Sequence, residues 1–179
     1  KCIIDLKSKK LEKIYSTFAI SLRNSTSKED TTRIINEKLF EPLDAIYPSL
    51  EYFCAKFTEL TYSKKDNPFN VKTKYALNRL NCYYSNKEIF EADGSIEHLC
   101  PESQGGLTLN IGNLILLEQK INNAAGEKEY KDKLRDYNKS QYKWIHKFCT
   151  DNPNWNESQI EDRASMMAET FYTRVLGRE

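Results

Sequence analysis

The chain of 179 residues lacks long apolar stretches, paired cysteines and a glycine-rich loop. No run approaches the roughly 20 apolar residues that cross a bilayer, and the first ten residues have no continuous secretory core, so we expect no membrane segment and no signal peptide. The five cysteines are scattered and never form a Cys-x-x-Cys pair. This spacing argues against a disulfide framework and a cysteine zinc site, and it favours the cytoplasm.

Three further absences limit what kind of protein the chain can be. Only two histidines are present, His98 and His146, which excludes a multi-histidine metal site. The six glycines form no phosphate-binding loop, so we expect no nucleotide hydrolysis by this chain. The first residue is not methionine, and we therefore expect the chain to be part of a longer protein.

Charge of one sign is not in excess. The 27 Lys and Arg residues against 26 Asp and Glu leave a formal net charge of only +1. Such a balance is not that of a strongly basic nucleic-acid binder, so any DNA contact would come from local patches. With 39 % hydrophobic residues, the chain can bury the core of one domain, or of a domain with a helical appendage.

Most of the chain has the periodicity of helices. Before residue 90, apolar residues recur at three- and four-residue steps in several segments, which predicts a helical region over residues 1–70 and a further helix that ends near Ser85. Ser27 is a plausible start signal for the second helix, and Pro42 is expected to end it. We expect these apolar stripes to pack in a core.

The pattern changes between residues 93 and 126. Residues 95–100 alternate and end at Pro101, a loop follows, and residues 113–117 form an apolar run of strand length. A polar, helix-like stretch from Gln119 is broken at Gly126. The expected order is strand, long loop, strand and short helix.

The remaining residues predict helices again. An apolar face runs from Tyr130 to Phe148 along one long segment, which Asp151-Asn152-Pro153 ends. Asn156 or Ser158 could cap the last helix. The predicted fold class is therefore mainly α, a helical domain with an inserted strand–strand–helix unit.

Residues 97–122 contain the minimum set for metal-dependent phosphodiester hydrolysis. Such a reaction needs a base near the phosphorus, and a histidine with an ordinary pKa of about 6.5 is neutral at cellular pH. It also needs a divalent cation, and Mg²⁺ accepts one carboxylate and one amide while it keeps several waters. Glu97 and His98 point to opposite faces of a regular strand, so Asn122 on the helix would complete the set, and Asn113 could tie the loop toward His98.

These residues resemble a known family. Ile96-Glu97-His98-Leu99-Cys100-Pro101, then Gln104-Gly105-Gly106, Asn113-Leu114 and Asn122 are similar to the HNH (ββα-metal) endonuclease motif. Within that group the chain most resembles the C-terminal domain of GmrSD-type restriction enzymes, which cut modified DNA in bacteria. The resemblance implies an HNH nuclease domain over residues 71–179 with a ββα-metal core at about 93–126. It is supported by residues 73–80, 111–118 and the final helix with Trp155, Ile160 and Arg163.

The resemblance also implies residue roles. His98 would be the general base, Asn113 would fix the loop and orient His98, and Glu97 with Asn122 would hold one Mg²⁺ or Mn²⁺. Three departures are visible: Glu97 replaces the commoner Asp, Asn123 beside Asn122 could be the ligand instead, and the zinc-binding cysteines of many HNH proteins are absent. The implied partners are DNA and an N-terminal ParB-like nucleotide-hydrolysing domain of the same protein.

DNA contacts are expected beside the proposed metal site. Residues 120–147 hold eight basic and four acidic residues, and Lys120 and Lys128 are the candidates for phosphate contact, although such a helix is often only a solvated face. Arg163 is a third candidate that could equally stabilise the last helix. The alternative function is a non-catalytic nucleic-acid-binding or scaffold module, with the N-terminal helices as a docking surface.

Overall fold

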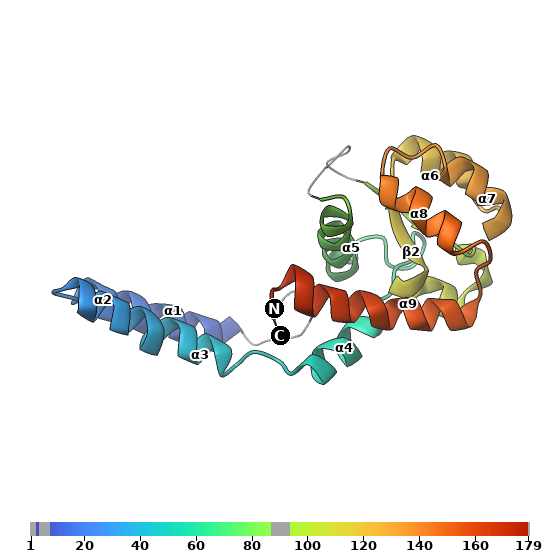
Figure 1. Cartoon of the computed structure of the whole chain (residues 1–179). Helices are drawn as coiled ribbons and strands as arrows, with labels where there is room; N and C mark the ends of the chain where they lie inside the picture. The colour runs from blue at the N-terminus through green and yellow to red at the C-terminus, as the bar shows by residue number, and fades with distance from the viewer. Residues whose placement is uncertain (1–2, 4–7, 87–93, 179) are drawn as a thin grey trace. The chain divides into compact units, whose positions relative to one another are not determined.

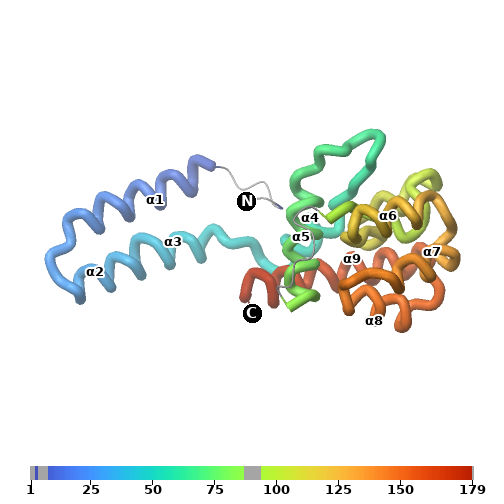
Figure 2. Tube along the Cα trace, turned by 90° about the horizontal axis from the view of Figure 1, so that it is seen from above, coloured from blue at the N-terminus to red at the C-terminus, as the bar shows by residue number. Residues whose placement is uncertain are grey.

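The computed structural model describes residue 3, residues 8–86 and residues 94–178 (Figures 1 and 2). It is mostly helical with one small two-stranded sheet, which confirms the mainly α prediction. The chain divides into two compact units, residues 1–52 and residues 53–179. Each unit is described by itself.

The first unit is a helical hairpin. Its elements are α1 (Ser8–Arg23), α2 (Lys28–Ile35), a π-helical turn (Asn36–Phe40) and α3 (Glu41–Asp44). Figure 2 shows α1 running alongside α2 and α3. The Ser27 side chain accepts a hydrogen bond from the backbone N–H of Asp30, which confirms the predicted start of α2. Among the described helical residues of α1–α3, Ile34 is the only buried one, so these helices bury little apolar surface.

Pro42 does not end the second helix, contrary to the prediction. The chain stays helical through the π-helical turn, in which the N–H of Glu41 donates to the carbonyl of Asn36, and Pro42 lies in the first turn of α3. A proline is tolerated in a first turn because the N–H that it lacks has no partner there in any case. The wider turn thus creates a new helix start inside a continuous helical segment.

The second unit contains the sheet and its covering helices. Its elements are the part of α4 (Leu50–Thr58) from Phe53 onward, α5 (Val71–Tyr84), β1 (Ser95–His98), β2 (Leu114–Leu117), α6 (Gln119–Ala125), α7 (Tyr130–Tyr137), α8 (Lys143–Asp151) and α9 (Glu157–Thr170). The strands are antiparallel, with Glu97 opposite Ile115 and His98 opposite Leu114. All four residues of β2 are buried because α5 packs against this strand.

Residues 53–70 belong to the second unit, whereas the sequence placed a boundary after residue 70. Phe57 is fully buried and its ring lies 5.5 Å from that of Phe171. The N–H of Tyr62 donates to the carbonyl of Leu109, and the carbonyl of Leu60 accepts from Ile111. These long-range contacts, which no local pattern announces, attach the segment to the sheet domain.

The predicted order of strand, loop, strand and helix is present between residues 95 and 125, and residue 93 lies outside the described residues. The loop contains three short 3-10 turns, at Glu102–Gln104, Gly106–Leu109 and Ile111–Asn113. Helix α6 ends at Gly126, which has a positive φ of 55°. Glycine adopts this conformation without the steric cost that other residues would have, and the predicted break is confirmed.

The long segment predicted over residues 130–148 is two helices, α7 and α8. The carboxylate of Glu118 accepts hydrogen bonds from the Ser140 hydroxyl and from the Gln141 N–H, and these bonds hold the connecting turn. An apolar stripe continues across the turn because Tyr137, Tyr142 and Ile145 all enter the same core. At the start of α9 it is Asn156 that caps the helix, by accepting from the N–H of Gln159.

Two negative findings concern the described part of the chain. The cysteines Cys54, Cys82, Cys100 and Cys149 are all free. Within residues 8–86 and 94–178, none of the helices combines the length and the apolar character that crossing a bilayer requires.

Candidate functional site

Strand β1 presents Glu97 and His98 to different surroundings. Glu97 is directed toward α7, where it meets Lys133 and Tyr137, whereas the ring of His98 lies beside Tyr62. The alternation of side chains along a strand produces this separation. The two candidates therefore lie on opposite faces, as the sequence predicts for a regular strand.

The His98 ring is buried, with 3 % of the residue exposed. Its Nε2 lies 3.0 Å from the carbonyl oxygen of Tyr62. A carbonyl oxygen can only accept, so Nε2 carries the hydrogen and Nδ1 keeps its lone pair in the neutral ring. Burial lowers the pKa of His98 below its ordinary value, although the Tyr62 carbonyl and Glu102 oppose the shift. The ring is thus held in the neutral form that can accept a proton.

Glu102 faces the lone pair of His98. Its Oε2 lies 3.8 Å from Nδ1, and its Oε1 accepts a 2.6 Å hydrogen bond from the Ser63 hydroxyl. Burial alone would raise the pKa of Glu102, but the bonds from Ser63 and from the backbone of residues 64 and 65 lower it overall. The carboxylate is therefore ionised, and it lies just beyond hydrogen-bond distance of Nδ1.

Glu97 forms a buried ion pair. Lys133 Nζ lies 2.8 Å from Glu97 Oε1 and donates a 2.6 Å hydrogen bond to the carbonyl of His98. The Tyr137 hydroxyl donates to the same Oε1 at 3.0 Å. Burial raises the pKa of Glu97, whereas Lys133 and Tyr137 act to lower it. Both contacts are on Oε1, so Oε2 is the oxygen available to a further cation.

Asn122 attaches α6 to β1. Its amide nitrogen donates to the Ser95 hydroxyl and to the carbonyl of Ile96, both at 2.8 Å. Its oxygen, Oδ1, accepts a 3.3 Å hydrogen bond from Lys64 Nζ. Asn123, in contrast, is exposed and accepts from Gln119 on the same helix. The structure thus brings Asn122 to the strand that carries Glu97 and leaves Asn123 at the surface.

The ammonium group of Lys64 connects three of the predicted site residues. Besides its bond to Asn122, it acts electrostatically on both Glu97 and His98, lowering the pKa of each. A positive charge thus lies next to the amide oxygen of Asn122 and in the field of the Glu97 carboxylate.

Asn113 closes the loop that follows His98. Its amide nitrogen donates to the carbonyls of Cys100 and Thr108, and its Oδ1 accepts from the N–H of Cys100 and from the indole N–H of Trp155. Its backbone carbonyl accepts from the N–H of Leu99. With no exposed surface, Asn113 can position this loop but cannot touch a substrate directly.

The three predicted DNA-binding residues are in different situations. Lys120 is exposed and makes no hydrogen bond or ion pair with the described residues. Lys128 is half exposed, and its ammonium donates to Asp136 and to the carbonyl of Ala124. Arg163 is buried and donates to the carbonyls of Gly112 and Leu114. Only Lys120 is thus open to a phosphate without rearrangement.

Sequence reasoning missed four residues of this site: Lys64, Glu102, Lys133 and Tyr137. Glu102 follows His98 by four residues, so spacing could have suggested it. Lys64 is 58 residues away from Asn122, and no local signal announces that contact. Lys133 was counted only as part of a basic segment, although it is 1 % exposed.

The donor chemistry of this site fits a hard divalent cation in part. No group of three or more His, Cys, Asp and Glu side chains suited to a metal occurs among the described residues. The amide oxygen of Asn122 nevertheless accepts from an ammonium group, the Glu97 carboxylate lies in the field of that charge, and Mg²⁺ can be held by one or two protein oxygens and water. Glu97 and Asn122 are therefore chemically compatible with such an ion.

Comparison with known families assigns the chain to one of them. Residues 47–170 match the family model of the GmrSD restriction endonucleases, C-terminal domain. The match covers more than half of the chain, which therefore belongs to this family. It includes β1, β2, α6 and every predicted site residue. Neither the curated proteins nor the solved structures yield a match.

Proposed function

We propose that the chain is a metal-dependent DNA endonuclease of the HNH type, which nicks or cleaves foreign or modified DNA in bacterial defence. In this proposal β1, β2 and α6 are the ββα-metal motif. The observation that supports it best is that Asn122 of α6 is bonded to β1, the strand that carries Glu97 and His98, while its amide oxygen lies beside the Lys64 ammonium. Family membership supports a nuclease acting on DNA.

Glu97 Oε2 and Asn122 Oδ1 would hold one Mg²⁺ or Mn²⁺, which would replace the Lys64 ammonium. Such an ion neutralises charge on the phosphate and on the leaving oxygen when bound. Lys133 would keep Glu97 Oε1 occupied and so fix the direction of the carboxylate. Asn122 would remain attached to β1 through its amide nitrogen.

His98 would take a proton from the attacking water at Nδ1. The Tyr62 carbonyl selects this tautomer by accepting from Nε2, and the ionised Glu102 would stabilise the imidazolium that forms. Because the ring is buried, a phosphate would reach Nδ1 only if the side chain of Lys64 moves aside while the Tyr62 carbonyl keeps its bond to Nε2. Displacement of Lys64 by the metal would therefore also open the way to His98.

The decisive test is a plasmid-nicking assay with Mg²⁺ or Mn²⁺. We expect His98→Ala to slow nicking by at least about 100-fold, which is the usual contribution of a general base. The matched control is His146→Ala, because His146 is half-buried on α8 and its ring bonds to the carbonyl of Ser140, away from the candidate site. Full activity of His98→Ala, with an unchanged melting temperature, would remove His98 from the mechanism.

Metal binding is tested separately by titration with Mn²⁺. Glu97→Gln and Asn122→Ala should weaken Mn²⁺ binding, whereas Asn123→Ala should leave it unchanged. Lys64→Ala should tighten it, because the metal no longer competes with an ammonium group. If Lys64→Ala instead abolishes nicking and leaves Mn²⁺ binding unchanged, Lys64 itself is the catalytic cation and the metal assignment is wrong.

A non-catalytic DNA-binding module is the second candidate. The burial of His98 and the ion pair of Glu97 with Lys133 favour it, because both side chains already have partners inside the protein. This function predicts salt-dependent DNA binding without any product in Mg²⁺ or Mn²⁺. The same nicking gel, run beside a binding titration, distinguishes the two functions.

The proposed activity includes contacts beyond the site. We place Lys120 and, after release from Asp136, Lys128 on the DNA phosphates, with Arg163 in a different role. An N-terminal ParB-like nucleotide-hydrolysing domain of the same cytoplasmic protein would supply the energy-coupled step. Lys120→Glu should weaken DNA binding at low salt, and an unchanged affinity would exclude Lys120 from the interface.

A further inference from the structure

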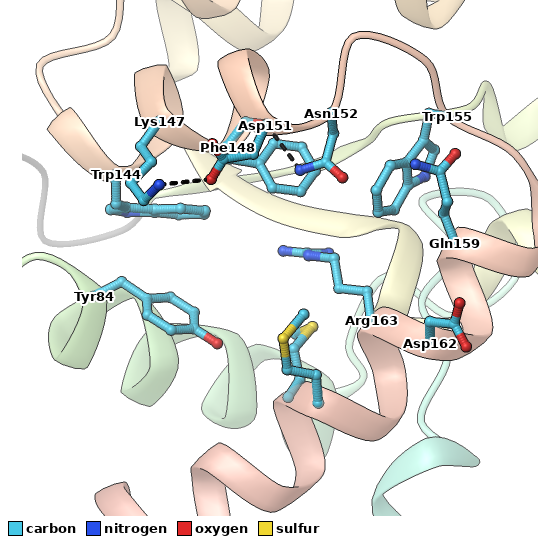
Figure 3. A pocket seen from close by; sticks show the side chains of 12 residues that line it. Tyr84, Trp144, Lys147, Phe148, Asp151, Asn152, Trp155, Gln159, Asp162 and Arg163 are labelled. Carbon is cyan, nitrogen blue, oxygen red and sulfur yellow. Dashed lines mark hydrogen bonds and ion pairs between the residues drawn. The ribbon is translucent and has the colours of Figure 1, made fainter.

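A pocket of about 540 Å³ lies within the second unit, between α8, α9 and the end of α5 (Figure 3). Its size is typical of small-ligand sites. Tyr84, Trp144, Phe148 and Trp155 contribute aromatic walls, and Figure 3 shows the guanidinium group of Arg163 pointing into the space among them. None of the mechanistic roles proposed above uses this pocket.

The aromatic walls form two pairs. The rings of Tyr84 and Trp144 have centroids 5.3 Å apart, and those of Phe148 and Trp155 are 5.2 Å apart. Trp144 donates its indole N–H to Asn81, and Trp155 donates its own to Asn113, so both indole donors are already satisfied. What the two tryptophans offer a ligand is therefore the face or edge of a ring, which suits stacking.

Arg163 is a buried cation with unused donors. It is 6 % exposed, and its Nη1 makes both of its hydrogen bonds, to the carbonyls of Gly112 and Leu114. Among the described residues, Nε and Nη2 donate to no acceptor, and no carboxylate lies within ion-pairing distance of the guanidinium. The Phe148 ring, 5.1 Å from Cζ, gives partial compensation through a cation–π contact.

A buried charge without a counter-charge is unfavourable. Burial lowers the pKa of Arg163 to about 10, the direction expected for a cation largely removed from water. Two N–H groups in one plane suit a ligand with two neighbouring acceptor atoms on a flat edge. The pocket thus combines stacking walls with a planar donor fork.

We propose that this pocket binds an unstacked nucleobase of the DNA, one that presents two adjacent acceptors to Arg163. The proposal rests on the proposed function in taking DNA as the ligand. Guanine offers O6 and N7, and cytosine offers O2 and N3, whereas adenine and thymine alternate donors and acceptors along their edges. Lys147, at the rim with its side chain 78 % exposed, donates to Asp151, and once released from that carboxylate it would suit the phosphate of the same nucleotide.

The pocket is also connected to the candidate nuclease site. Trp155 bonds to the side chain of Asn113, and Arg163 bonds to the carbonyls on either side of that residue. A base that engages these two side chains would therefore be linked through them to the segment that closes the loop after His98. Base binding would fix the loop during cleavage.

Tryptophan fluorescence tests the proposal directly, because the only two tryptophans of the chain, Trp144 and Trp155, line the pocket. The protein is titrated without metal with dGMP, dCMP, dAMP and dTMP, and with deoxyribose 5-phosphate as the probe without a base. We expect dGMP or dCMP to quench the emission with an affinity at least fivefold higher than dAMP and dTMP. One bidentate contact is worth about 1–3 kcal/mol, which corresponds to at least this factor.

Two variants assign the contact. Arg163→Lys keeps the charge but removes the fork, and it should abolish the preference among bases. Because Arg163 is buried and its replacement can unfold the protein, a second variant narrows the mouth of the pocket instead. Met166→Tyr places a ring at a position that is 60 % exposed and should weaken dGMP or dCMP binding at least fivefold. Ser165→Tyr, an exposed neighbour on α9 outside the pocket lining, is its control.

Equal quenching by all four nucleotides and by deoxyribose 5-phosphate would overturn the proposal, as would dGMP binding that Met166→Tyr leaves unchanged. The titration needs neither metal nor cleavage. A protein that binds the bases but does not nick DNA therefore contradicts the proposed function alone. A protein that nicks DNA but does not discriminate bases contradicts this inference alone.

Discussion

At the scale of single residues, Asn113 is notable because its fully buried side chain makes four hydrogen bonds. Its side chain serves the two polar backbone atoms of Cys100, the carbonyl of Thr108 and the indole of Trp155. Each of these groups loses its protein partner if the amide is removed. A buried polar group left without a partner costs about 1–3 kcal/mol.

Asn113→Ala is therefore expected to lower the free energy of unfolding by at least about 3 kcal/mol, since several such penalties add. Urea denaturation measures the difference. The matched control is Asn123→Ala on the exposed face of α6, where surface substitutions change stability by about 0.5 kcal/mol or less. Similar losses for the two variants would show that the Asn113 bonds do not stabilise the loop.

The pH dependence of stability is expected to involve Asp136. Hydrogen bonds from Lys128 and Lys139 lower the pKa of Asp136 from 3.8 to about 2. A lowered pKa in the folded state means that the unfolded chain binds the proton more readily. The contribution of Asp136 to the free energy of unfolding is thus fully present well above pH 3.8, and it is lost as the pH falls toward 2.

Asp136→Asn should therefore flatten the fall of the melting temperature between pH 5 and pH 3. Thermal unfolding at a series of pH values in this range gives the comparison. Asp132→Asn, one turn earlier on α7 and without an ion pair among the described residues, serves as the control. A parallel fall in Asp136→Asn and the unchanged protein would exclude Asp136 as a source of acid sensitivity.

At the scale of elements, α9 lies unusually close to the turn Ile111–Asn113. A Cβ atom on Gly112 would collide with the carbonyl oxygen of Ile160 in α9. The same close approach lets Arg163 reach the carbonyl of Gly112. A glycine is needed here for proximity rather than for its backbone angles.

Gly112→Ala is expected to push α9 away and to lower the free energy of unfolding by about 1–3 kcal/mol or more, the usual cost of overpacking. Thermal and urea unfolding measure it, and the emission of Trp155 reports any shift near Asn113. Gly94→Ala is the control, because its Cβ would lie 3.4 Å from the Cβ of Leu116, close to ordinary contact. Stability equal to that of the control would mean that α9 adjusts freely.

Local sequence patterns are sufficient to predict the strands and the short helix of the sheet region. The apolar run before Glu118 predicts β2, and Gly126 predicts the end of α6, because both depend on neighbours in sequence. The break between α7 and α8 escaped prediction because Glu118, more than twenty residues away, supplies its hydrogen bonds. Pro42 was misread since a π-helical turn upstream alters which N–H groups need partners.

The same distinction applies to the candidate site. The spacing of Glu97, His98, Asn113 and Asn122 could be recognised because a motif fixes it along the chain. The partners that determine the protonation and orientation of these residues come from elsewhere: Lys133 from α7, and Tyr62 with Lys64 from the segment before α5. No periodicity encodes such pairings, which exist only once the chain is folded.

At the scale of the whole molecule, the chain consists of a hairpin that buries little and a domain that contains the core. The family match begins at residue 47, shortly before α4. All residues of the candidate site and of the aromatic pocket belong to the second unit. The first 46 residues therefore contribute no side chain to either site.

A fragment of residues 47–179 is expected to fold on its own, with a melting temperature within a few degrees of that of the full chain. Circular dichroism measures folding, and tryptophan emission should be unchanged because both tryptophans lie in this fragment. Under the proposed function the fragment also nicks DNA. An unfolded or aggregated fragment would show that the N-terminal hairpin is required for the stability of the nuclease domain.

Asn113 holds the loop that follows His98, and this has a consequence for the length that the loop can have. Both ends of the loop are fixed, whereas at Gly105 and Gly106 an added side chain would meet open space. The entropy cost of closing a longer loop grows only slowly with each residue added. Residues inserted between these glycines would therefore be accommodated at the surface without shifting His98.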